Sequence, residues 1–293
     1  MLFRSPEYNQ ANPPEAEVAR DCDMAIVCAG FNSDTEREGG DRTFELPYEQ
    51  ADMIRAVTAA NPRTIVVLTG GGNMEMESWI GGAEAVLHAW FPGQEGGQAI
   101  AEVLFGEVNP SGKLPVSFER APEDNPTSAS YHSPDKKSVF YSEGVFMGYR
   151  GFDKSGIRPR YAFGHGLSYT TFDFSDLKLT KSELRQGEGV SVSFTVKNTG
   201  DRAGATVGQV YVHDPESSEP RPVKELKGFT KVMLKPGESK TVTVDLAPEA
   251  LKFWHPSARK WVAEAGKFEV LVGPASDELP LRAEFDLVAT KPR

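Results

Sequence analysis

The pattern of apolar and polar positions divides the chain into two halves with different periods. In the first half, short apolar and β-branched runs at 24–29, 64–68 and 85–90 predict buried strands. Between and after them, apolar residues recur at helical spacing from Leu46-Pro47 to Pro62, and again at 99–105. Strands that alternate with helices favour parallel pairing, so this half predicts an α/β fold with helices on both faces of the sheet.

The second half, from Phe172 onward, alternates apolar and polar residues with a period of two. This alternation is clearest at 190–196, 207–212 and 241–246, and it predicts short, half-buried strands. Turn signals separate the strands, at residues 198–201, Pro215, 236–237 and 265–266. Several short strands with regular turns predict an all-β domain, a β-sandwich.

Between the two halves lies a stretch rich in proline and aromatic residues. Because its aromatic side chains need something to pack against, we expect an ordered connector rather than a flexible linker. The aromatic residues concerned are Tyr141, Phe146, Tyr149, Phe152, Tyr161 and Phe163. The predicted organisation is therefore an α/β domain over 1–120, the connector over 121–170 and the β-sandwich over 171–293.

Four aromatic residues of the β-sandwich half are candidates for packing in its core or between domains: Phe194, Trp254, Trp261 and Phe268. A sugar-stacking surface is the alternative interpretation. Cys28 lies inside an apolar run, which favours a buried free thiol, and Cys22 is the only other cysteine. The sequence therefore predicts neither a disulfide nor a cysteine metal site.

Histidine spacing and the glycine run 70–72 carry no cofactor signal. The five histidines, at 88, 132, 165, 213 and 255, show no spacing that metal ligands require. Gly70-Gly71-Gly72 follows a strand but lacks both nucleotide-binding fingerprints, so a tight turn is preferred over a phosphate cradle. We expect no metal and no cofactor.

The charge balance limits the partners. With 42 acidic and 32 basic residues the formal net charge is −10, which argues against nucleic acid and against anionic membranes. No apolar run approaches the roughly 20 residues that a membrane span needs. Residues 1–17 are polar and carry no export signal, so the localisation of a parent protein stays open between periplasmic or secreted and cytoplasmic.

The loop that follows the first predicted strand is the strongest candidate for chemistry. It carries four acidic and two arginine residues within 34–42, at the strand end where α/β sheets bind ligands. A charge cluster of this kind also suits a solvated loop. Gly30 and Gly39-Gly40 flank the cluster and favour function, because glycine costs backbone entropy in a loop with no role.

Seven segments, in the right order, resemble glycoside hydrolase family 3, the family of many β-glucosidases. They are 90–97, 104–115, 141–153, 163–170, 196–200, 209–212 and 227–229. The loop run Glu38-Gly39-Gly40-Asp41-Arg42 resembles the family's Glu-Gly-x-Asp-Arg, which implies that Glu38 is the general acid/base. Glu36 is the rival for that role, and Asp41 and Arg42 either support the loop or form a local ion pair.

The resemblance implies an α/β sandwich domain followed by a fibronectin type III-like domain, as part of a retaining, exo-acting β-glucosidase-like hydrolase. The family's nucleophilic aspartate lies on an N-terminal barrel domain. The 293 residues start just before the first strand of the α/β domain, so we expect no barrel among them. The implied partners are a β-linked glucoside and that barrel, in the same polypeptide or on another subunit. A non-catalytic sugar-binding or interaction module, a β-xyloside hydrolase and a homo-oligomer stay open.

Overall fold

The computed structural model describes residues 14–131 and 137–289, which form two compact units. Unit 1 comprises the described residues up to Glu107 together with Arg120–Pro122; unit 2 comprises Val108–Glu119 and the described residues from Glu123 onward. From Glu123 onward, the described part of the predicted connector thus groups with the β-rich part, and the three-part division of the chain stays a prediction. Residues 1–13, which make up most of the N-terminal segment searched for an export signal, lie outside the described residues, as does His132.

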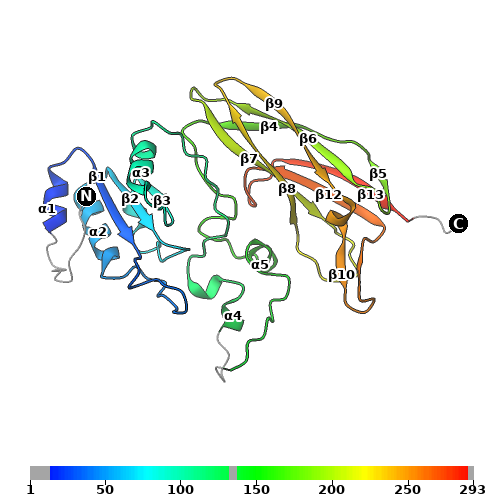
Figure 1. Cartoon of the computed structure of the whole chain (residues 1–293), viewed down its shortest axis with the longest axis horizontal. Helices are drawn as coiled ribbons and strands as arrows, with labels where there is room; N and C mark the ends of the chain where they lie inside the picture. The colour runs from blue at the N-terminus through cyan, green and yellow to red at the C-terminus, as the bar shows by residue number, and fades with distance from the viewer. Residues whose placement is uncertain (1–13, 132–136, 290–293) are drawn as a thin grey trace. The chain divides into compact units, whose positions relative to one another are not determined.

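Unit 1 is built around a three-stranded parallel sheet in the order β1-β2-β3, flanked by helices (Figure 1). This confirms the α/β class predicted for the first half. The elements are α1 (Pro14–Arg20), β1 (Ala25–Gly30), α2 (Gln50–Ala60), β2 (Thr64–Thr69), η1 (Ile80–Gly82), β3 (Ala85–His88) and α3 (Gly96–Leu104).

The core of unit 1 lies between the central strand and α2. Val66 and Leu68 of β2 are fully buried, and α2 contributes Ile54 at 0% exposure. This helix starts at Gln50 rather than at the predicted Leu46-Pro47. The prediction was wrong because the two residues before Gln50 adopt left-handed backbone conformations, which cannot continue a right-handed helix.

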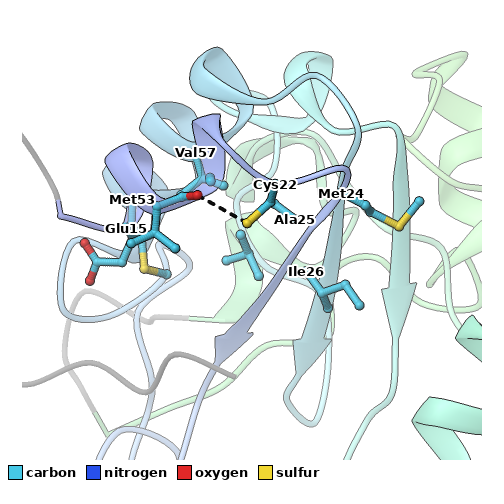
Figure 2. A pocket seen from close by; sticks show the side chains of 10 residues that line it. Glu15, Cys22, Met24, Ala25, Ile26, Met53 and Val57 are labelled. Carbon is cyan, nitrogen blue, oxygen red and sulfur yellow. Dashed lines mark hydrogen bonds between the residues drawn. The ribbon is translucent and has the colours of Figure 1, made fainter.

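Strand β1 is an edge strand, and its second face is only partly covered. Cys28, predicted to be buried, is half-buried, and Ile26 on the same face is 40% exposed. Burial still raises the pKa of the Cys28 thiol. A small hollow of about 150 Å³ lies between α1, β1 and α2, where the Cys22 thiol donates a hydrogen bond to the Val18 carbonyl at 3.2 Å (Figure 2).

Unit 2 contains the predicted β-sandwich. A five-stranded sheet, in the order β5-β13-β12-β7-β8, faces a three-stranded antiparallel sheet, in the order β4-β6-β9. The strands are β4 (Phe172–Leu179), β5 (Glu183–Arg185), β6 (Val190–Asn198), β7 (Gly204–His213), β8 (Glu225–Leu234), β9 (Ser239–Leu246), β12 (Gly266–Gly273) and β13 (Leu281–Val288). The short helix η3 (Pro248–Leu251) and the hairpin β10 (Phe253–His255) and β11 (Lys260–Val262) complete this half.

Two of the four aromatic candidates lie in the sandwich core and two do not. Phe194 and Phe268 are fully buried, as expected for inward positions of strands with a period of two. Trp254 and Trp261 are 49% and 64% exposed. They pair across the β10–β11 hairpin with ring centroids 5.9 Å apart, so they cover each other instead of entering the core.

The predicted connector is ordered where the structure describes it, and part of it packs on the sandwich. It contains η2 (Pro122–Asp124), α4 (Ser128–Tyr131) and α5 (Tyr149–Ser155). The Tyr149 ring stacks on Phe163 at 5.2 Å, and its hydroxyl accepts a hydrogen bond from the Leu226 backbone N–H. Tyr141 does not follow the prediction: it is 79% exposed.

A buried ionic cluster stands beside α5. The Arg221 side chain is 5% exposed and forms ion pairs with Asp214 at 2.9 Å and with Glu225 at 2.7 Å. Glu225 also pairs with Lys227 at 2.9 Å and, at 3.7 Å, with Arg150 of α5. The cluster therefore links the connector helix to the sandwich through charges that satisfy one another.

Candidate functional site

The acidic loop 30–42 begins where β1 ends, at the carboxyl edge of the parallel sheet. The same edge carries Gly70-Gly71-Gly72 after β2 and Trp90 after β3. Backbone hydrogen bonds join the three segments: Phe31 N–H donates to the Thr69 carbonyl, and Gly70 N–H donates to the Trp90 carbonyl. The loop thus lies at the sheet edge where α/β folds place their ligand sites.

Gly30 allows the chain to leave the sheet at this point. Its φ is +138°, and a Cβ added there would lie 1.9 Å from the Thr69 carbonyl oxygen. The Gln50 side chain then fixes the exit, since its Oε1 accepts from Gly30 N–H at 2.6 Å and its Nε2 donates to the Gly30 carbonyl at 3.1 Å. The first residue of α2 therefore holds the base of the loop.

The first turn of the loop is organised by Asn32. Its side-chain oxygen accepts from the backbone N–H groups of Asp34 and Thr35, and the Glu36 N–H donates to the Asn32 carbonyl at 2.8 Å. Such an Asx turn is a local alternative to helix or sheet. It sets the direction in which the Glu36 side chain leaves the backbone.

Glu36 faces inward and is engaged on several sides. Its carboxylate accepts from Gly71 N–H at 3.1 and 3.2 Å and pairs with the Arg42 Nε at 3.2 Å. A Cβ on Gly71 would lie 2.6 Å from a Glu36 oxygen, so the glycine leaves room for the carboxylate. The glycine run that could have held a phosphate instead donates to a carboxylate of the protein itself.

Arg42 connects this carboxylate to the rest of the sheet edge. Its guanidinium donates to the carbonyls of Asn73 and Thr43 and lies over the Phe31 ring, 4.4 Å from the centroid. Its side chain is 18% exposed. Arg42 pairs with Glu36, whereas Asp41 beside it is exposed.

Glu38 stands at the tip of the loop. Arg37 and Gly40 form a β-bridge around it, and Gly39 takes a φ of +74° to close the turn. Glu38 is exposed, and its carboxylate has no hydrogen-bond or ion-pair partner among the residues that the structure describes. The structure therefore brings Glu36 and Arg42 together and pairs neither of them with Glu38.

His88 and Trp90 were missed as neighbours of this site. The His88 Nε2 lies 3.2 Å from the Gly72 carbonyl oxygen, and its ring lies 4.5 Å from the Trp90 ring centroid. Burial lowers the pKa of His88, and the nearby Arg42 acts in the same direction. The position of both residues at the end of the third strand was a usable signal, because all three strand ends meet at one edge.

The donor set of the loop suits proton transfer and hydrogen bonding. Within 14–131 and 137–289, no group of three or more His, Cys, Asp or Glu residues is arranged to hold a metal ion. A carboxylate presented by a fixed loop can instead donate or accept a proton at a bound substrate.

Comparison with known families identifies the chain. Residues 8–169 match the model of the glycosyl hydrolase family 3 C-terminal domain, which is more than half of the chain. The chain belongs to glycosyl hydrolase family 3. Residues 206–276 match a fibronectin type III-like domain, in agreement with the sandwich.

Several proteins of family 3 resemble almost the whole chain. Probable beta-glucosidase I of Aspergillus clavatus is 43% identical over 282 residues, covering 94% of this chain and 33% of that protein. Thermostable beta-glucosidase B of Acetivibrio thermocellus is also 43% identical, over 94% of this chain and 36% of that protein. A crystal structure of beta-glucosidase from Kluyveromyces marxianus with glucose superposes with a TM-score of 0.87 at 41% identity, covering 94% of this chain and 33% of that chain.

These comparisons confirm the predicted family and the pairing of an α/β domain with a fibronectin type III-like domain. The chain spans about a third of the length of the curated relatives it matches. The described residues include no helix long and apolar enough to cross a bilayer.

Proposed function

We propose that this chain is part of a retaining β-glucosidase and that Glu38 is its general acid/base. The observation that carries the proposal is the contrast between the two loop glutamates. Glu36 is held by Gly71 and Arg42, whereas Glu38 is exposed at the tip of the fixed turn 37–40. A carboxylate that lacks partners among the described residues is available to a substrate.

Retaining hydrolysis uses two carboxyl groups about 5 Å apart. One attacks the anomeric carbon and forms a glycosyl-enzyme, while the other protonates the leaving oxygen and then deprotonates water. Glu38 would supply the second carboxyl. The first would come from the aspartate of the family's barrel domain, in the same polypeptide or on another subunit.

The rest of the loop would position Glu38. Gln50 fixes its base, and the Glu36–Arg42 pair fixes its middle against the Gly70–Gly72 segment. We assign Arg42 to positioning through this pair. Asp41, next to it and exposed, is proposed to support the loop, as the Glu-Gly-x-Asp-Arg motif implies.

The leaving group of the substrate tests this role in a β-glucosidase that contains the barrel together with this chain. Glu38→Ala should slow hydrolysis of alkyl β-glucosides by about 100- to 10,000-fold, because their leaving oxygen needs a proton. For dinitrophenyl β-glucoside, formation of the glycosyl-enzyme should be nearly unchanged, because that leaving group departs without help. Equal losses in the first step for both substrates would overturn the assignment.

Two alternatives remain open: a non-catalytic sugar-binding module, and an enzyme for another β-glycoside such as a β-xyloside. The names of the relatives favour β-glucosides, since they are called beta-glucosidases. The turnover of p-nitrophenyl β-glucoside and of p-nitrophenyl β-xyloside by the barrel-containing protein distinguishes a β-glucosidase from a β-xylosidase. Absence of turnover for both would favour the binding module.

A further inference from the structure

Unit 2 contains a polar hollow of its own, far along the sequence from the acidic loop. Its volume is about 290 Å³, near the lower end of the roughly 300–1,000 Å³ of small-molecule sites. Segments from four parts of unit 2 line it: 111–113, 166–174, 205–206 and 274–278. A hollow of this size suits a ligand no larger than a single sugar ring.

One wall of the hollow is held in place by backbone contacts. Leu114 N–H donates to the His165 carbonyl and Gly164 N–H donates to the Leu114 carbonyl, both at 2.8 Å. Gly166 packs so tightly on Gly112 that an added Cβ would lie 2.1 Å from the Gly112 carbonyl oxygen. Contacts within the chain therefore hold this wall in place.

Thr206 places a hydroxyl at this hollow. It lies on β7, is 3% exposed, and its hydroxyl has no hydrogen-bond partner among the residues that the structure describes. The neighbouring Thr170 differs, since its hydroxyl donates to the Asn198 side chain at 2.6 Å. The Thr206 hydroxyl is open to the hollow and can hydrogen-bond to water or to a ligand bound there.

Two opposite charges line the same hollow. The Lys113 ammonium donates to the Gly166 carbonyl at 2.7 Å, which uses one of its three N–H groups. Glu278 also lines the hollow, and no ion pair joins it to Lys113 or to any other described residue. Burial lowers the pKa of Lys113, and the charge of Glu278 opposes that shift.

This combination selects the charge of a ligand. For an anion the attraction of Lys113 is offset by the repulsion of Glu278, and for a cation the reverse holds, whereas a neutral hydroxyl can accept from the ammonium and donate to the carboxylate. Phe172 and Leu167 add apolar surface that suits the C–H face of a sugar ring. We propose that this hollow binds a neutral polyhydroxylated ligand of the size of one hexose, with Lys113, Thr206 and Glu278 as its polar contacts.

D-glucose, added to the isotope-labelled 293-residue chain, is the probe, and NMR amide shifts are the readout. Saturable shifts should centre on residues 111–113, 205–206 and 274–278, with a dissociation constant in the millimolar range. Thr206→Val should weaken this binding roughly three- to tenfold, because one neutral hydrogen bond is lost. Its melting temperature should stay equal, since the Thr206 hydroxyl makes no hydrogen bond to another described residue.

Thr243→Val, the same change at an exposed position of β9, is the matched control and should leave glucose binding unchanged. Glu38→Ala should also leave it unchanged, so this site and the acid/base proposal can fail separately. Lys113→Met should weaken glucose binding about tenfold or more. If Lys113→Met folds poorly, the glucose affinity of Thr206→Val is the deciding measurement.

Three results would overturn the site. The first is no glucose-dependent shift at about 100 mM. The second is saturable binding of inorganic phosphate or tetramethylammonium in place of glucose. The third is equal glucose affinity in Thr206→Val and Thr243→Val.

Discussion

The acidic loop of unit 1 and the ionic cluster of unit 2 both gather acids and bases, but they use them differently. In the cluster, the side chains of Arg221, Asp214 and Glu225 are 4–12% exposed and satisfy one another. In the loop, Glu36 and Arg42 form a similar pair, while Glu38 is left exposed beside them. Removing one partner of a buried pair leaves the other charge uncompensated, so both partners are committed to the fold. Under the proposed function, Glu38, whose carboxylate has no described partner, is the residue that acts on the substrate.

Removing the central cation of the unit 2 cluster should have the largest effect on stability. Arg221→Ala would leave Asp214 and Glu225 with less compensation in a buried place, at a cost of about 3–5 kcal/mol. Denaturant unfolding of the 293-residue chain measures this loss. A loss below about 1 kcal/mol is typical of exposed ion pairs and would contradict a buried cluster whose charges satisfy one another.

The matching change in unit 1 is Arg42→Ala. It removes the Glu36 pair, two carbonyl contacts and the packing on Phe31, and should destabilise unit 1 by about 2 kcal/mol. Arg37→Ala is the control in the same loop, because Arg37 is exposed and its side chain has no partner among the described residues. Equal effects of the two changes on the unfolding midpoint would remove the positioning role of Arg42.

The two loop glutamates should differ in stability as well. Glu36→Gln weakens the contacts to Gly71 and Arg42 and should cost about 1 kcal/mol, whereas Glu38→Gln should leave the unfolding curve unchanged. Thermal unfolding of both variants beside the parent chain is the measurement. A destabilised Glu38→Gln protein would show that Glu38 has a structural partner.

The smallest expected effect is the pH dependence of His88. Its pKa is lowered by burial, so the folded chain resists the proton that the unfolded chain takes up. Stability from this group is present above the unfolded pKa of about 6.5 and is lost as the pH falls toward the folded pKa. When the pH is lowered from about 7.5 to 5.5, the melting temperature of unit 1 should fall less in His88→Gln than in the parent chain. An unchanged slope would mean that His88 titrates alike in both states.

Much of the architecture was predictable because it depends on periodicity. The strands at 64–69 and 190–198 follow from apolar runs and from alternation, and the family resemblance supplied the order of the domains. Local backbone geometry was not predictable: the left-handed residues Tyr48 and Glu49 delay α2, and nothing in their identity requires that conformation.

The site was predictable in its place and only partly in its contacts. The strand-end rule and the Glu-Gly-x-Asp-Arg run pointed to loop 30–42, but the sequence alone could not tell which glutamate has partners. That difference depends on Gly71, which is 35 residues from Glu36 in the chain. The exposure of Trp254 and Trp261 was also not predictable from the sequence. Two tryptophans that pair across a short hairpin look the same in the sequence as two tryptophans that pack in a core.

Azide rescue tests the central claim most directly, in a protein that contains the barrel and this chain. With dinitrophenyl β-glucoside, azide should accelerate turnover by Glu38→Ala and yield β-glucosyl azide, because azide attacks the glycosyl-enzyme without a general base. Glu36→Ala should show no azide acceleration, since this variant keeps the Glu38 carboxylate as its general base, even where the loop that positions it is weakened. Formation of β-glucosyl azide by Glu36→Ala and not by Glu38→Ala would contradict the account and transfer the role to Glu36.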